Sequence, residues 1–333
     1  MVSPVFLLAS ERSGTNLLRR RISERQNTIL GPSPLHFLKH LHYAEPYYVD
    51  LNKNDNFLRY IADGLGLAYH HFSPWDVRFE PADILDAYPD LVEGKRTSVG
   101  IMHTLYTLYA KSKGYSTYFC KDNNLFDFVS EIQSEIEGAR FIYLHRDPRD
   151  VVLSQQKRPF QNHGIAYLSC LWRDEQIKCI KHANSLSKSG SLIKISYENL
   201  VRDESEILKQ LSTFLRIKMS APNQEVFAEE RTDIQEWANL NSPTIQDNFG
   251  KFKQKLSASV IRKIESVCWF QMHWLDYEPV HSLRPVYSKK RQVIERAFSG
   301  FERVLRSRIG KGRVNRSQAD RSNYVLELRR KWH

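Results

Sequence analysis

The sequence predicts an α/β protein whose parallel sheet is covered by helices on both faces. Short apolar runs recur along the chain, and each one is followed by a stretch of helical periodicity. Strands that alternate with helices in this way are typical of parallel sheets. The chain has 333 residues, of which 41% are apolar and 26% charged, so it can bury one large core or two modest ones. This composition excludes a disordered, collagen-like or coiled-coil chain.

The first predicted strand is the apolar run Val2–Ala9, which ends at a polar turn that contains glycine. The residues after the turn place Leu17, Leu18 and Ile22 at helical spacing, so we predict strand, loop and helix in this order. Residues 33–116 are rich in Tyr, His and Leu without strong alternation, and we predict that they form a mostly helical insertion.

Three further strands are predicted, each followed by a helix, and a loop and a helix complete the body. The strands are Ser116–Cys120, Arg140–His145 and Ser191–Ser196, the helices after them lie within residues 125–137, 149–157 and 203–215, and the last loop and helix span Asn248–Trp274. The composition changes after Pro285, so we divide the chain into a body of residues 1–283 and an extension of residues 284–333.

The extension carries the whole net charge of +11, because it holds 15 Lys and Arg against 4 Asp and Glu, whereas the body holds 34 of each. A neutral body with a basic tail argues against a nucleic-acid-binding protein. Apolar residues between Val293 and Ile309 recur every three or four positions, which predicts an amphipathic basic helix. Such a helix lies on an anionic membrane, meets an acidic glycan or packs on the protein's own body, and residues 310–333 are left open to disorder.

No apolar run approaches the roughly 20 residues of a membrane-spanning helix, and Val5–Ala9 is too short for a signal peptide. The four cysteines form no CxxC pair and no metal-ligand pattern. We therefore expect reduced thiols in a cytoplasmic protein, with peripheral membrane contact through the tail as an open addition.

The segment Phe6–Leu18 is the first candidate site. Its sequence, FLLASERSGTNLL, leads from a buried strand through a tight turn into a helix, an arrangement that points free backbone N–H groups at an anion. Gly14 permits close approach of the backbone, Ser13 and Thr15 add hydroxyl groups, and Arg12 adds a planar cation. The GxxxxGK(S/T) pattern of a Walker A loop is absent. The structural alternative is an ordinary N-capped helix.

A second candidate is the segment YLHRDPRDVVLS, in which an apolar strand ends at Arg146 and Pro148 suits the start of a helix. Ser154 follows Arg146 after two helical turns, so a guanidinium and a hydroxyl converge on one side. This pair suits a phosphate monoester. The structural alternative is a salt bridge between Arg and Asp at the helix start.

Together, the segments SERSGTNLL and YLHRDPRDVVLS resemble the 5′-phosphosulfate loop and the 3′-phosphate motif of the sulfotransferase family. ISYENLVRD resembles a further family segment, and FGKFKQKL is a looser match to a basic one, so the resemblance covers about residues 2–280. Within the family, the chain most resembles the bacterial branch and the branch that acts on carbohydrates or protein tyrosines. It implies a P-loop NTPase-like three-layer fold and transfer of a sulfuryl group from 3′-phosphoadenosine 5′-phosphosulfate (PAPS) to a hydroxyl or amine, with a carbohydrate or glycolipid as the expected acceptor. No metal is required, because positioning and fixed cations stabilise such a transfer.

The resemblance also implies a role for each matching residue. The 5′-phosphosulfate is assigned to Arg12, Ser13, Gly14, Thr15 and Asn16, the 3′-phosphate to Arg146 and Ser154 with Lys251 and Lys253 as weaker candidates, and the adenosine to Tyr197. Asn16 stands where the family usually has a second Thr, and Glu11, a carboxylate beside an anion site, is expected to point away.

The general base remains open. His36 is the first choice because histidine titrates near neutrality, although packing is the alternative in a stretch that also holds His40 and His42. Lys121 is implied near the transferring group, and Asp122 is an outside candidate for the base.

Two other functions are weighed. A P-loop kinase acting on a small molecule is disfavoured by the missing Gly-Lys-Ser/Thr, and a non-catalytic nucleotide- or glycan-binding protein would use the same loops. For the acceptor, the Tyr/His/Trp-rich segment 42–75 offers aromatic faces to sugars or apolar tails.

Overall fold

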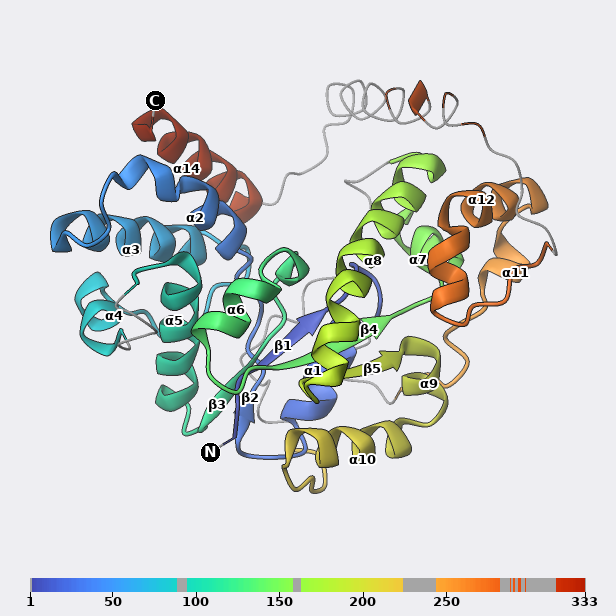
Figure 1. The fold of residues 1–333 in the computed structure, drawn as a ribbon, viewed down its shortest axis with the longest axis horizontal. Helices are drawn as coiled ribbons and strands as arrows, with labels where there is room; N and C mark the ends of the chain where they lie inside the picture. The colour runs from blue at the N-terminus through green and yellow to red at the C-terminus, as the bar shows by residue number, and fades with distance from the viewer. Residues whose placement is uncertain are drawn as a thin grey trace.

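A parallel sheet lies at the centre of the computed structural model (Figure 1), which describes residues 2–88, 95–157, 163–223, 244–281 and 316–332, together with residues 288, 290, 293, 294 and 297. Within these residues the strands form a five-stranded sheet in the order β2-β3-β1-β4-β5, and every pairing is parallel. The strands are β1 (Val5–Leu8), β2 (Ile29–Leu30), β3 (Thr117–Cys120), β4 (Arg140–His145) and β5 (Leu192–Ser196).

The central strand β1 is buried along its whole length, which explains its continuous apolar sequence. It pairs with β4 from Val5 opposite Arg140 to Leu8 opposite Tyr143, and with β3 on its other side. The four predicted strands are confirmed, and β4 has the predicted bounds. Strand β2 was not predicted, because two residues are too few to show an alternating pattern.

Helices cover both faces of the sheet, so the predicted three-layer, P-loop-like α/β fold is confirmed. Val5 and Leu7 of β1 belong to an apolar cluster with residues of α1 (Thr15–Ser23), α9 (Tyr197–Arg202) and α10 (Glu204–Leu215). Phe6 and Leu8 point the other way. They join a larger cluster with residues of α5 (Ser98–Ser112), α6 (Val129–Glu135), α8 (Ile165–Lys188) and α12 (Ala258–Trp274).

The predicted helical insertion forms α2 (Leu38–Ala44), the 3-10 turn η1 (Glu45–Tyr48), α3 (Asn54–Tyr69), α4 (Pro81–Ala87) and α5. These helices gather on one side of the sheet (Figure 1). The predicted helix over 125–137 is interrupted, because Phe128 separates the 3-10 turn η3 (Leu125–Asp127) from α6. Helix α8 was missed, since its buried face includes the polar Gln176.

Two short helices complete the body: α7 (Pro148–Gln155) follows β4, and α11 (Phe252–Lys255) precedes α12. The chain's last described element, α14 (Arg316–Trp332), packs against α3 and buries Leu328 completely (Figure 1). Most of the predicted amphipathic helix over 293–309 lies outside the described residues. None of the described helices is long and apolar enough to span a membrane. All four cysteines are buried, and none of them forms a disulfide bond.

Candidate functional site

The loop after β1, residues 9–14 and called the glycine loop below, turns sharply because two of its residues have left-handed backbones. Arg12 has a φ of 69° and Gly14 a φ of 87°, and α1 begins directly afterwards at Thr15. A Cβ atom on Gly14 would lie 2.3 Å from Cδ2 of Tyr197, so the sequence needs glycine here both for its conformation and for this contact. The loop thereby meets the start of α9, where Tyr197 is buried.

A chain of hydrogen bonds fixes the loop from the protein interior. The hydroxyl of Ser13 lies 3.0 Å from that of Ser10, and Ser10 Oγ accepts a bond of 3.2 Å from Gln176 Nε2. Gln176 Oε1 in turn accepts a bond of 2.6 Å from the hydroxyl of Tyr143 on β4. Ser13 and Gln176 are fully buried, so the loop has a preset shape.

Arg146, at the end of β4, crosses directly to this loop. Its Nη1 donates to the carbonyl oxygen of Arg12 at 3.0 Å, and its Nη2 donates to that of Asn248 at 3.1 Å. Its guanidinium carbon lies 4.1 Å from the ring centroid of Tyr197. Arg146 is only 8% exposed, yet its Nε atom has no hydrogen-bond partner, and none of the described carboxylates lies within ion-pair distance of it. Arg146 is thus a buried cation beside the glycine loop that forms no ion pair with a carboxylate of the described residues, although its charge also acts on the nearby Asp150.

The salt bridge considered as the structural alternative exists, but it uses the other arginine of the motif. Arg149 donates to Asp147 at 2.6 Å and to Glu265 of α12 at 2.6 Å. Asp147 also caps α7 by accepting the N–H of Arg149. Arg149 therefore anchors α7 to α12, which leaves Arg146 available to the loop.

The segment that precedes α11 closes over Arg146. The carboxylate of Asp150 accepts the backbone N–H groups of Gly250 and Phe252, the latter at 3.0 Å, and so ties the segment to α7. Lys251 donates to the side chain of Asn248, and Asn248 Nδ2 donates to the hydroxyl of Tyr197 at 2.6 Å. The structure thus brings Lys251 to the site.

The structure also gives the positions of the other predicted donor-site residues, which the sequence alone could not give. Arg12 Nε donates to Ser154 Oγ at 3.2 Å, so the first and second motifs touch directly. Asn16 is half-buried at the start of α1, and its Oδ1 is buried without a hydrogen-bond partner. Lys253 is exposed on α11, and the structure gives it no contact with the loop.

A second group of residues lies across Glu11 from this loop. Glu11 Oε1 accepts a bond of 2.7 Å from Asn123 Nδ2, and the backbone N–H of Asn123 donates to His36 Nδ1 at 2.9 Å. A ring nitrogen that accepts a hydrogen bond carries no proton, so the proton of neutral His36 is on Nε2. His36 can thus donate a hydrogen bond from Nε2. It can accept a proton at Nε2 only after its own proton has moved to Nδ1, which breaks the hydrogen bond from Asn123.

The surroundings of His36 favour its neutral form. Burial lowers the pKa of His36 well below its usual range, and the charges of Lys121 and Arg321 and the neighbouring His71 lower it further. Asp122 is buried behind it, where its Oδ1 accepts the N–H of Leu35 at 3.0 Å and the hydroxyl of Tyr106 at 2.8 Å.

Burial also raises the pKa of Asp122, and its Oδ2 has no hydrogen-bond partner. Lys121 is half-buried next to this carboxylate in the chain, directly after β3. The predicted residues His36, Lys121 and Asp122 therefore lie together, although the sequence separates the first from the other two.

Sequence reasoning missed Glu175 and Arg321. Glu175 lies on α8 with Oε2 buried and without a hydrogen-bond partner, and burial together with Glu11 raises its pKa to about 8. Arg321 lies on α14 and contacts the backbone at His36. A polar residue on a helix gives no sequence signal for such placements, because only the tertiary fold buries it.

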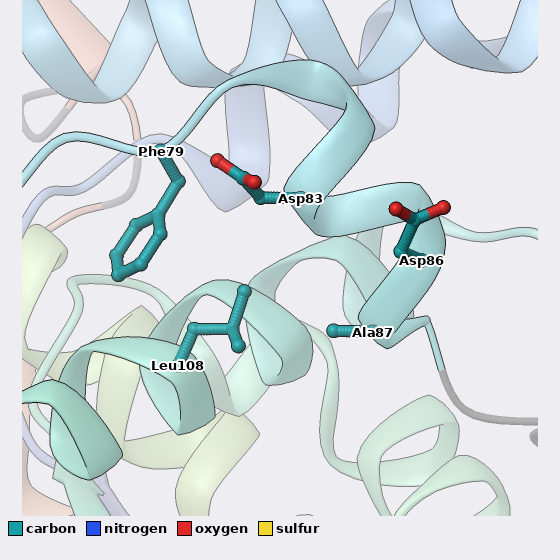
Figure 2. Close-up of a pocket in the computed structure, with 5 residues that line it drawn as sticks. All are labelled: Phe79, Asp83, Asp86, Ala87 and Leu108. Atoms are coloured by element: carbon teal, nitrogen blue, oxygen red, sulfur yellow. The ribbon is translucent and has the colours of Figure 1, made fainter.

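Outside this region, Figure 2 shows a pocket between α4 and α5. Phe79, Asp83, Asp86, Ala87 and Leu108 line it, and none of them belongs to the glycine loop or to a strand end. Among the described residues, no group of His, Cys, Asp and Glu could hold a metal ion.

Comparisons with known proteins place the fold in context. Solved structures similar to the chain include the sulfotransferase domain of the Synechococcus PCC 7002 olefin synthase, which is 16% identical, with 89% of this chain and 94% of that chain covered and a TM-score of 0.44. The sulfotransferase domain from the curacin biosynthetic pathway is 17% identical, with coverages of 84% and 99% and a TM-score of 0.46. Mouse sulfotransferase SULT7A1, complexed with PAP, is 14% identical, with coverages of 82% and 85% and a TM-score of 0.44.

A search of curated proteins finds no match. The model of the sulfotransferase family matches residues 4–221, which is more than half of the chain and includes both the glycine loop and Arg146. The chain therefore belongs to the sulfotransferase family.

Proposed function

We propose that this sulfotransferase uses PAPS as its donor and transfers the sulfuryl group to a hydroxyl or amine of a carbohydrate or glycolipid. The observation that carries the choice of donor is Arg146, a buried guanidinium beside the glycine loop whose Nε has no hydrogen-bond partner and which forms no ion pair in the part of the chain that the structure describes. A buried charge is costly unless it is paired, so an anionic ligand would stabilise this arrangement. A nucleotide that carries phosphate groups at both ends of its ribose fits a site with two neighbouring anion-binding segments.

The donor would be held by the two motifs together. We assign its 5′-phosphosulfate to the loop residues Arg12–Asn16, since the first N–H groups of α1 have no intrahelical partners and no side chain caps them. The 3′-phosphate is assigned to Arg146 and Ser154, with Lys251 next to them. Tyr197, packed between Gly14 and Arg146, would border the adenosine.

PAPS, once bound, supplies a sulfuryl group on a good leaving group, and the protein's part is positioning and charge stabilisation. Arg12 would neutralise charge that develops on the departing phosphate. Lys121 would lie near the transferring group. His36 is neutral and carries its proton on Nε2, so it would contact the acceptor as a hydrogen-bond donor. It would act as the base only if the hydrogen bond from Asn123 were replaced by a proton on Nδ1.

Two substitutions separate the roles of His36. Glutamine keeps an N–H donor and cannot act as a base, whereas alanine removes both functions. If His36 acts as a donor, His36→Gln retains most of the activity and His36→Ala loses it. If both variants lose activity equally, His36 is the base, and if neither does, Asp122 or Glu175 takes that place.

Turnover measurements test the function itself. The full chain is incubated with PAPS and a panel of sugar, glycolipid and phenol acceptors, and formation of 3′-phosphoadenosine 5′-phosphate (PAP) is followed. Acceptor-dependent PAP release supports the proposal. ATP consumption with Mg²⁺ would instead identify a kinase, and tight PAP binding without turnover on any acceptor would identify a binding protein.

A further inference from the structure

His36, Lys121 and Asp122 form the part of the site that the proposed function assigns to the acceptor, here called the acceptor half. The C-terminal helix α14 lies beside it, although α14 is outside the part of the chain that the family model matches. Leu328 is fully buried in the main core, and the ring of Tyr324 stacks on that of His70, with the centroids 4.5 Å apart and the planes at 7°. A Cβ atom on Gly66 of α3 would lie 2.0 Å from the hydroxyl oxygen of Tyr324. The absence of a side chain at Gly66 thus makes room for α14.

From this docked helix, Arg321 reaches the backbone at His36. Its Nη1 donates to the carbonyl oxygen of Leu35 at 2.8 Å, and its Nη2 donates to that of His36 at 2.5 Å. The N–H of Leu35 is bound from the other side by Asp122. The guanidinium fork matches two adjacent carbonyl groups, which a lysine cannot do.

The backbone at His36 needs such support. Its φ of 52° lies in the left-handed region, which is unfavourable for a residue with a side chain because Cβ comes too close to the following carbonyl oxygen. Strained residues of this kind persist only where their surroundings hold them in place. In this conformation the His36 ring accepts the N–H of Asn123, and Arg321 binds the two carbonyl groups that flank the Cα atom of His36.

We propose that Arg321 is a positioning residue and that α14 completes the acceptor half of the site by fixing His36. The proposal rests on the proposed function only for the contact of His36 with the acceptor. The groups that face His36 are Lys121 and Asp122 after β3, His71 after α3, His40 on α2 and Arg321 on α14. Of these groups, Arg321 is the most distant from His36 in the sequence.

The test reads the His36 ring directly in the full chain, without substrate. Ring nitrogen and carbon signals are followed by NMR across pH in histidine-labelled protein, and His36→Gln assigns the signal. Arg321→Ala should raise the pKa of His36 toward its usual value, because a neighbouring positive charge is removed. It should also mix the Nε2–H tautomer with the other one. Arg321→Lys should retain the low pKa but not the single tautomer.

Gly66→Ala provides an independent variant. Its added methyl group displaces Tyr324 and so disturbs the docking of α14, whereas alanine itself favours the helical conformation of α3. It should reproduce the change in the His36 ring. Arg330→Ala, an exposed residue on the same helix, is the matched control and should leave the ring unchanged. An unaltered His36 ring in both Arg321→Ala and Gly66→Ala would overturn the proposal.

Activity then separates this proposal from the proposed function. Arg321→Ala should lower acceptor-dependent PAP release roughly 10- to 100-fold, as expected for a displaced contact group, while the Kd of PAP stays unchanged. If the ring responds as expected but His36→Ala remains fully active, the positioning is real and the assigned role of His36 is wrong. If the ring does not respond, the positioning itself is wrong, whatever the activity.

Discussion

On the proposed function, Arg146 is the charged partner of the donor's 3′-phosphate, and its replacement with alanine should remove this contact. The guanidinium uses one N–H of Nη1 and one of Nη2 on carbonyl groups, so its Nε–H and the remaining terminal N–H groups are left for a ligand. A hydrogen bond to a charged group contributes about 1.5–3 kcal/mol. The Kd of PAP should therefore rise about 10- to 150-fold.

The same replacement has a second cost that the structure makes visible. The carbonyl groups of Arg12 and Asn248 lose their donors, and each buried unpaired group costs about 1–3 kcal/mol. Both carbonyl groups are only partly buried, so the combined cost lies in the lower part of the resulting range of about 2–6 kcal/mol, and Arg146→Ala should lower the free energy of unfolding by about 2–4 kcal/mol. Arg140→Ala is the matched control, because Arg140 lies at the other end of β4 and likewise donates to a carbonyl group, that of Gly190.

Calorimetry with two nucleotides separates recognition from stability. PAP carries the 3′-phosphate, and adenosine 5′-phosphate lacks it, so the lost contact should weaken PAP far more than the analogue. Arg140→Ala should leave both affinities unchanged. Equal losses for PAP and adenosine 5′-phosphate in Arg146→Ala would refute the assignment of Arg146 to the 3′-phosphate and leave it a residue that only shapes the loop.

Three further outcomes follow from the same structure. Arg12→Ala should lower kcat about 100-fold or more with little change in the Kd of PAP, and a large KM increase at unchanged kcat would contradict its role at the departing group. Glu175 has a pKa raised from 4.5 to about 8, so the folded chain holds a proton that the unfolded chain loses, and stability falls by up to about 1.4 kcal/mol per pH unit across that window. Glu175→Gln should therefore gain thermal stability over the native chain at pH 8 but not at pH 4.5, and an equal gain at both would argue against a buried proton. Finally, changing the exposed basic residues Arg329, Arg330 and Lys331 to glutamate should abolish salt-sensitive binding to anionic vesicles without unfolding the chain, and unaltered vesicle binding would exclude this end of α14 as a membrane contact.

The half of the site to which we assign the donor, formed by the glycine loop and Arg146 and here called the donor half, follows from local sequence. The run into Arg146 is apolar, and Pro148 begins a helix at the predicted position, with Asp147 as its N-cap. Gly14 has the positive φ that a tight strand-to-helix turn requires. These signals act within a few residues, and so the strands, the loop and the motif could be predicted.

What the sequence could not decide is which of two arginines is used for which purpose. Arg146 and Arg149 both flank Asp147, and local spacing suits either for a salt bridge. The choice is made by Glu265, a buried carboxylate on α12 that is 116 positions away and takes Arg149. Similarly, the strained backbone of His36 depends on Arg321, 285 positions away. Contacts over such distances in sequence leave no periodic or motif signal.

The two halves of the site therefore differ in how they are determined, and this has a consequence for specificity. The donor half is built within the region that matches the family model, by Gly14, Arg146 and their immediate neighbours. The acceptor half takes Arg321 from a helix outside that region. Sequence changes in α14 can thus alter the position of His36 while every donor contact stays in place. On this reasoning, exchange of α14 should change the choice of acceptor and leave PAP affinity as it is, because α14 holds His36, which we propose faces the acceptor, and lies outside the segments that we assign to the nucleotide.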